Sequence, residues 1–157
     1  MKRLALLSFL SFYTLSLFAQ SPLKGFEPFI GGEWYLENSF QTLEWGVGKK
    51  SVIAKNYFLI NDRQTLVSEG MWLWHPERRK IIGYFTAINM PVSFFEYETD
   101  FVDGVMKSKI KAYDLQGNLT VYQESWTIVK ENEFEWMLYE QVGSEWVQSM
   151  NGLYIRE

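Results

Sequence analysis

Two residues far apart in the chain constrain its fold more than any other feature. Trp34 follows Gly32 and Glu33 at the start of the first predicted strand, and Arg156 lies in the last one. If the guanidinium of Arg156 stacks on the indole face of Trp34, the first and last strands are joined by a cation–π contact. Such a contact requires a sheet that curls round until its two ends meet. The pair therefore indicates a closed barrel.

The chain after Phe40 consists of short β-type segments separated by turn signals. Segments rich in Val, Ile, Thr and aromatic residues recur about every eight to twelve residues, the spacing of an all-β barrel or sandwich. We predict an all-β fold, a single antiparallel up-and-down β-barrel of about eight to ten strands, with a short helical turn over 22–31 that plugs one end. The predicted strands are 33–38, 41–47, 51–60, 65–75, 80–89, 92–102, 105–113, 118–129, 134–142 and 146–156.

The motif Gly32-Glu33-Trp34, with a helical turn before it and Arg156 in the last strand, resembles the lipocalin-like (calycin-type) β-barrels. These barrels carry Gly-x-Trp on their first strand and an Arg near the C-terminus that packs across the Trp. The chain resembles in particular the uncharacterised exported bacterial lipocalin-like domains, which imply a fold but no activity. Fatty-acid-binding proteins also open with Gly-x-Trp, but residues 38–52 leave no room for the two helices that they insert.

The N-terminal residues predict export. Met1–Ala19 combines the basic residues Lys2 and Arg3, an apolar run and a small residue before Gln20, as a signal peptide does. A membrane anchor is the alternative, but the apolar run of about 15 residues is shorter than the roughly 20 that a spanning helix needs. We expect a periplasmic or extracellular protein without a membrane span after cleavage, in which residues 20–157 form one lipocalin-like barrel domain.

Composition excludes several classes of site. The chain contains no cysteine, which excludes disulfides, thiolate metal sites and a cysteine nucleophile. Loss of Lys2 and Arg3 would take the net charge from −4 to −6, which argues against nucleic acid as a partner. His75 is the only histidine and precedes Pro76 in a predicted turn, so we expect it at the surface. A nitrobindin-type barrel binds haem through one strand His, but this turn position argues against it. We predict no metal and no cofactor.

Asp103-Gly104 is a strong signal for a two-residue hairpin turn, which sets the register of the strands on either side. Every acid on one face of this hairpin then has a base directly opposite. This ladder of opposed charges fixes the register of the hairpin and keeps that face exposed to solvent. Its carboxylates are therefore not expected to be a catalytic pair. The opposed residues are Asp100 and Lys107, Glu98 and Lys109, and Glu96 and Lys111.

A second group of polar residues lies in the last three predicted strands. Three-residue loops at 131–133 and 143–145 would place Glu124 opposite Glu140, and Glu140 opposite Gln148, on one aromatic face. Two facing carboxyls in a low-dielectric interior keep one proton, which could be donated to a ligand carbonyl or carboxylate. Alternatively, the row lies in water at the barrel mouth, or a two-residue loop shifts every position by one.

We therefore predict an exported barrel that binds a small apolar or amphipathic molecule in its interior. One alternative is a cofactor-free acid–base enzyme of the lyase or isomerase type that uses the carboxyl pair. Another is a partner-binding envelope protein without a ligand. The predicted ligand-binding residues are Trp72, Tyr84, Glu124, Trp126, Trp136, Leu138, Glu140 and Gln148. No catalytic residue is predicted.

Overall fold

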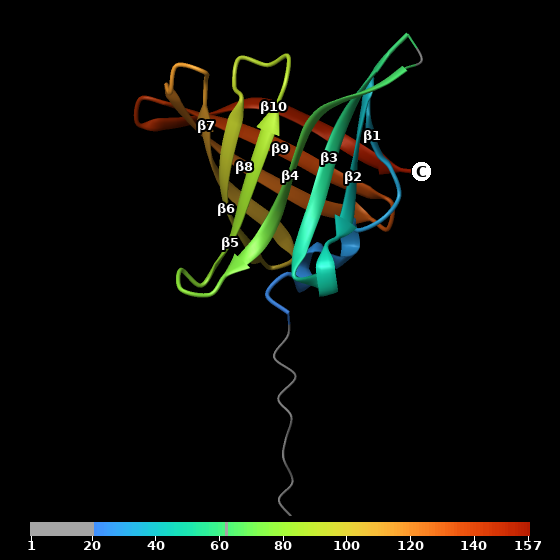
Figure 1. Ribbon diagram of the computed structural model, residues 1–157. Coiled ribbons are helices and arrows are strands. Elements are labelled where there is room, and N and C mark those ends of the chain that lie inside the picture. The colour runs from blue at the N-terminus through green and yellow to red at the C-terminus, as the bar shows by residue number, and fades with distance from the viewer. Residues whose placement is uncertain (1–20, 62) are drawn as a thin grey trace, which may run out of the picture.

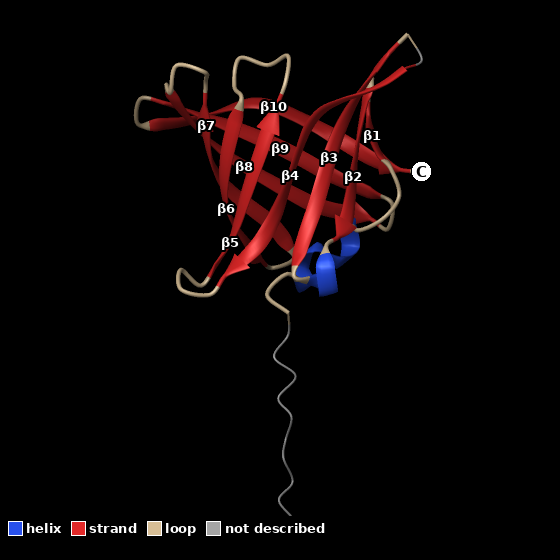
Figure 2. Ribbon diagram, in the orientation of Figure 1, coloured by secondary structure: helices blue, strands red, loops and turns tan. Residues whose placement is uncertain are grey.

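The computed structural model describes residues 21–61 and 63–157, which form an all-β closed barrel (Figure 1). Its ten antiparallel strands follow one another around the ring in chain order, and β1 closes the ring between β2 and β10. Short turns join the strands, and two short helical segments lie at one end of the barrel (Figure 2). The up-and-down topology predicted from sequence is confirmed. The predicted signal peptide, Met1–Ala19, lies outside the described residues.

The structure confirms the predicted strands, with small differences at their ends. The helical turn expected over 22–31 is a short 3₁₀ helix, η1 (Lys24–Phe29), and a second, η2 (Val47–Lys49), follows the second strand. The strands are β1 (Trp34–Leu36), β2 (Ser39–Trp45), β3 (Ser51–Ile60), β4 (Arg63–His75), β5 (Lys80–Ala87), β6 (Phe94–Val102), β7 (Val105–Tyr113), β8 (Leu119–Lys130), β9 (Glu133–Val142) and β10 (Glu145–Arg156).

Helix η1 plugs the lower end of the barrel (Figure 1). Its side chains Phe26 and Phe29 are fully buried in the core. The ring of Phe29 packs edge-on against Trp126 and Phe134, with centroids 5.4 and 5.3 Å apart. The indole N–H of Trp34 donates a hydrogen bond of 2.9 Å to the carbonyl of Phe29. Aromatic packing therefore fills the lower part of the barrel and leaves the space above it free.

Trp34 and Arg156 meet as the sequence predicts. They are direct cross-strand partners on β1 and β10, and the guanidinium carbon lies 4.6 Å from the centre of the indole ring. Gly32 permits this contact, because a Cβ atom there would lie 2.7 Å from the Arg156 side chain. Arg156 also donates hydrogen bonds to the side chain of Asn132 at 3.0 Å and to the carbonyl of Glu131 at 2.8 Å. One side chain thus joins β1, β10 and the β8–β9 turn.

The hairpin of β6 and β7 has the predicted register, with Glu98 opposite Lys109. The ion pairs, however, extend to a third strand. Glu96 lies 3.9 Å from Lys111 of β7, whereas Glu98 lies 3.2 Å from Lys80 of β5. Lys80 takes this role because it begins β5 next to Ile81, which pairs with Thr99 of β6, so its ammonium lies between the carboxylates of Glu98 and Asp100. The ladder is a solvated surface feature.

Replacement of Arg156 by alanine should lower the free energy of unfolding by about 1–3 kcal/mol, because the stacking contact and its hydrogen bonds are lost together. Arg156→Lys keeps the charge but not the planar fork, so its loss should be intermediate. Urea unfolding measures both. Arg63→Ala, at an exposed position, is the matched control. Equal stability of the Arg156→Ala and Arg63→Ala variants would contradict the role given to Arg156.

Candidate functional site

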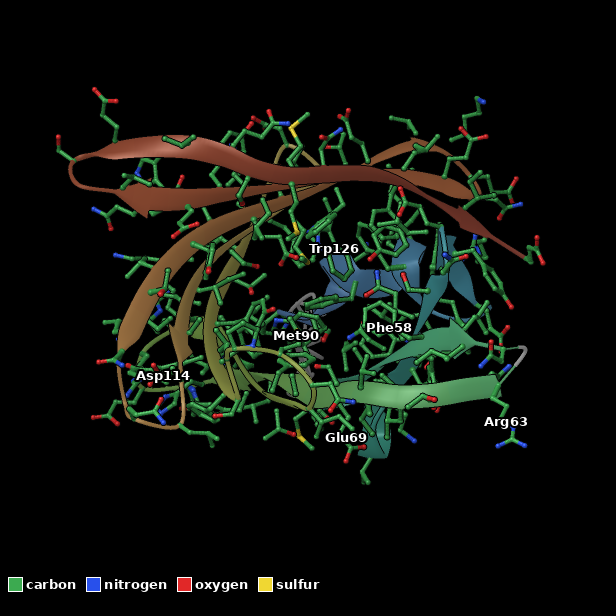
Figure 3. All side chains as sticks on the ribbon, turned by 90° about the horizontal axis from the view of Figure 1, so that it is seen from above. Phe58, Arg63, Glu69, Met90, Asp114 and Trp126 are labelled. Atoms are coloured by element: carbon green, nitrogen blue, oxygen red, sulfur yellow. The ribbon has the colours of Figure 1, made fainter. Side chains whose placement is uncertain are left out.

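Above the aromatic plug, the barrel encloses a cavity of about 570 Å³ that opens to solvent at the upper end. Side chains from all ten strands line it, together with the β5–β6 loop. Figure 3 looks into this end: Phe58, Met90 and Trp126 lie within the ring of strands, whereas Arg63 and Glu69 lie outside it. Phe58 and Met90 are both half-exposed at the mouth. The volume falls within the range of small-molecule pockets, about 300–1,000 Å³.

Glycines on the inner face let large aromatic side chains lie against the barrel wall. Gly83 is the cross-strand partner of Trp72, and a Cβ atom there would lie 2.6 Å from the indole. Gly70 pairs with Phe85 in the same way, and a Cβ atom there would lie 2.5 Å from the phenyl ring. Side chains that lie over glycine occupy less of the interior than side chains that extend across it.

The main polar group of the cavity is the carboxyl of Glu124 on β8, which is 8% exposed. Its Oε1 accepts a hydrogen bond of 2.8 Å from the indole N–H of Trp136, whereas its Oε2 has no hydrogen-bond partner. Burial raises the pKa of Glu124 from 4.5 to about 7. The indole N–H groups of Trp126 and Trp136 partly offset this rise, although only that of Trp136 forms a well-aligned hydrogen bond.

Two phenols share this part of the cavity. Burial raises the pKa of Tyr97 on β6 and of Tyr154 on β10, and the negative charge of Glu124 adds to both shifts. Both hydroxyls are therefore uncharged at physiological pH, and they bring aromatic surface and polar atoms close to the carboxyl. Two further donors of the cavity, Nε1 of Trp72 and Nε2 of Gln41, are buried without a hydrogen-bond partner.

The predicted facing pair of Glu124 and Glu140 is wrong. Glu124 lies opposite Leu138, and Glu140 lies opposite Tyr122. The β8–β9 turn has two residues and not three, while a β-bulge at Val129 adds one residue to β8. The turn and the bulge offset each other in side-chain alternation, so both carboxyls still line the cavity. They are displaced along the strands and are no longer directly opposed.

The strands β9 and β10 show a related correction. Leu138 pairs with Met150, but Gln148 pairs with Tyr139 and not with Glu140 as predicted. The β9–β10 turn is also one residue shorter than predicted, which shifts the partner of Gln148 by one position. A bulge at Ser149 then adds one residue to β10. Gln148 is exposed and lies outside the cavity.

Of the other predicted site residues, Trp72, Trp126, Trp136 and Leu138 line the cavity with Glu124 and Glu140. Tyr84 does not, because it alternates with Gly83 and Phe85 and so projects from the outer face, where it stacks on Phe94 with centroids 6.1 Å apart. Sequence reasoning missed Gln41 and Tyr154. Gln41 pairs with Trp34, and Tyr154 pairs with Phe134, so each points inward with its buried partner. The signal that could have found them is this register with two core aromatic residues.

Comparison with known protein families found no matching family, and comparison with curated proteins found no match. The closed up-and-down barrel of ten antiparallel strands fits a lipocalin-like fold. Among residues 21–61 and 63–157, no helix has the length and apolar character to cross a membrane, and no three His, Cys, Asp or Glu side chains gather as a metal site. His75 accepts a hydrogen bond of 3.2 Å from the backbone N–H of Arg78 at the β4–β5 turn.

Glu124→Gln should remove a pH-dependent loss of stability. Between pH 4.5 and about 7 the folded protein keeps a proton on Glu124 that the unfolded chain has lost, so stability falls as pH rises through this window. The difference between the two pKa values corresponds to about 3 kcal/mol of unfolding free energy. Glutamine still accepts from Trp136, so the variant should exceed the parent by up to about 3 kcal/mol at pH 8 and match it near pH 4.

Urea unfolding of parent and variant across this pH range measures the difference. Glu69→Gln, on the outer face, is the control for loss of an exposed carboxylate. A stability difference between the Glu124→Gln variant and the parent that stays constant across the pH range would contradict the buried state of this carboxyl.

Proposed function

We propose that this barrel binds a small apolar or amphipathic molecule reversibly in its cavity, and that the protein is exported. The observation that carries the binding proposal is the open cavity of about 570 Å³, with aromatic and aliphatic walls and one buried carboxyl. Pockets of this kind hold a ligand by its apolar surface and orient it with a few polar groups. Export is supported by the composition of Met1–Ala19.

The polar atoms of the cavity support the proposal that it holds a ligand. Oε2 of Glu124 and the N–H groups of Trp72 and Gln41 are buried and lack hydrogen-bond partners. An unsatisfied buried polar group costs about 1–3 kcal/mol. A ligand that carries complementary polar atoms would recover part of this cost, while its apolar body would release water from the walls.

The register does not favour the acid–base alternative in the form derived from sequence. That hypothesis depends on two carboxyls that face each other and share a proton. Glu124 faces Leu138 instead, and the hydrogen-bond partner of its carboxyl is the neutral indole of Trp136. Binding without chemistry is therefore the function that this site supports best.

The neutral dye Nile red should bind the cavity, with increased dye emission and altered tryptophan emission, because Trp72, Trp126 and Trp136 line it. Ser68→Trp places a large side chain in the cavity and should weaken binding at least about tenfold, or about 1.4 kcal/mol. Thr86→Trp, at an exposed position of β5, adds the same side chain outside and should bind as the parent does. Equal dye binding by both variants would place the dye elsewhere.

A further inference from the structure

The charged groups that line the cavity have one sign. Glu124 and Glu140 are the carboxyls among the lining residues, and none of the lining residues is Lys, Arg or His. A carboxylate ligand would add a third negative group to a cavity without a counter-ion, and like charges in a low-dielectric space repel strongly. The lining therefore disfavours fatty acids and other anions, although their chains would fit the apolar walls.

Glu124 itself lacks a partner of opposite charge. Its cross-strand neighbour on β7 is Ser108, while Lys107 and Lys109 alternate with Ser108 and face outward. Its neighbour on β9 is Leu138. Oε2 has no hydrogen bond. A buried carboxylate is costly unless a positive group pairs with it, and the protein supplies none on the inner face of either adjoining strand.

Aromatic rings surround the carboxyl. Trp136 donates its hydrogen bond, Trp126 lies directly across from Trp136, and Tyr97 and Tyr154 lie close enough for the charge of Glu124 to raise the pKa of both phenols. Tyr154 packs edge-on against Trp136, with centroids 6.3 Å apart. The π faces of such rings attract organic cations, and a desolvated site strengthens the attraction.

We propose that the ligand is an organic cation, an apolar or aromatic body with a protonated amine or quaternary ammonium group, and that Glu124 binds the charged nitrogen within this aromatic cluster. The inference rests on the proposed function, that the cavity binds a small molecule. Oε2 of Glu124 supplies the counter-charge, Trp126, Trp136, Tyr97 and Tyr154 supply π surface, and the walls above them receive the apolar body.

A cation and a neutral ligand differ in the sign of their pH dependence. A cation requires ionised Glu124, so its affinity falls as the pH drops below about 7, the pKa of the free protein. A neutral ligand with a carbonyl acceptor requires protonated Glu124 and binds more tightly in acid. The other titratable groups facing this part of the cavity are Tyr97 from β6, Tyr122 from β8, Glu140 from β9 and Tyr154 from β10. Burial raises the pKa of all three phenols, so they stay neutral in this range.

The test uses benzyltrimethylammonium, whose charge is permanent, and its uncharged isostere neopentylbenzene. Both are titrated into the purified protein at several pH values, with tryptophan emission and displacement of Nile red as readouts. At pH 8 the cation should bind at least about tenfold more tightly than the isostere. Between pH 8 and pH 6 its affinity should fall about tenfold, as expected for one proton with a pKa of about 7, while that of the isostere stays constant.

Glu124→Gln should abolish both the preference for the cation and its pH dependence, while Nile red still binds. Glu140→Gln is the matched control, because its carboxyl also lines the cavity but has no hydrogen bond to the aromatic cluster. Loss of the preference in Glu140→Gln and not in Glu124→Gln would overturn the assignment to Glu124. The pH dependence is measured on the unaltered protein, so the test does not require the variants to fold.

The remaining outcomes separate this inference from the proposed function. If Nile red binds but the protein shows no preference for the cation, or binds the cation more tightly in acid, the cationic ligand is ruled out. The proposal that the cavity binds a small molecule is then retained. Phenylacetate, an anion of similar size, should bind most weakly of the three compounds. Tighter binding of phenylacetate than of the cation would also overturn the inference. If neither Nile red nor the cation binds, both proposals fail.

Discussion

The structure depends on the closure of its sheet between β1 and β10. The backbone part of this seam is short, because β1 has three residues and two Cα pairs, Trp34 with Arg156 and Tyr35 with Ile155, join it to β10. Glu33 and Glu157 extend it by backbone hydrogen bonds of 3.4 and 3.1 Å. The side chain of Arg156 compensates by stacking on Trp34 and by hydrogen bonds to the β8–β9 turn and to the carbonyls of Pro28 and Ile30. A closed sheet has no free edge, and only a closed sheet encloses an interior.

The helix η1 decides how much of that interior is free. Phe26 and Phe29 fill the lower part, and Phe29 contacts Trp126, which also lines the cavity. Trp126 therefore forms part of the cavity floor, and Glu124 lies two residues along β8 on the same inner face. The carboxyl is thus placed at the inner end of the cavity, where packed aromatic rings remove water on one side. Its raised pKa follows from this position.

Local signals in the sequence predicted the strands, the helical turn, the closure pair and the register at Asp103-Gly104, because turn residues and side-chain alternation are local properties. The bulges at Val129 and Ser149 have no such signal, since the residues in them are ordinary strand residues. The bulge at Val129, together with the two-residue β8–β9 turn, moved Glu140 away from Glu124 and left the inner face of β8 and β9 unchanged. Gln148 was misplaced because the β9–β10 turn has two residues and not three. The apolar pattern on both faces of β4 and β5 concealed that Tyr84 points outward.

Alternation along the strands also sorts charge between the two sides of the wall. On β7 every lysine faces water and Ser108, Ile110 and Ala112 face inward, so the bases that balance the acids of β6 cannot reach the interior. A carboxyl on the inner face is then left without a counter-ion, and it lowers stability as pH rises through the window between its unfolded and folded pKa values. Residues that lower the stability of the fold in this way are expected where a protein binds a ligand. Leucine at position 124 would fill the same space without that cost, and it would lack the buried carboxyl that we propose as the counter-charge of the ligand.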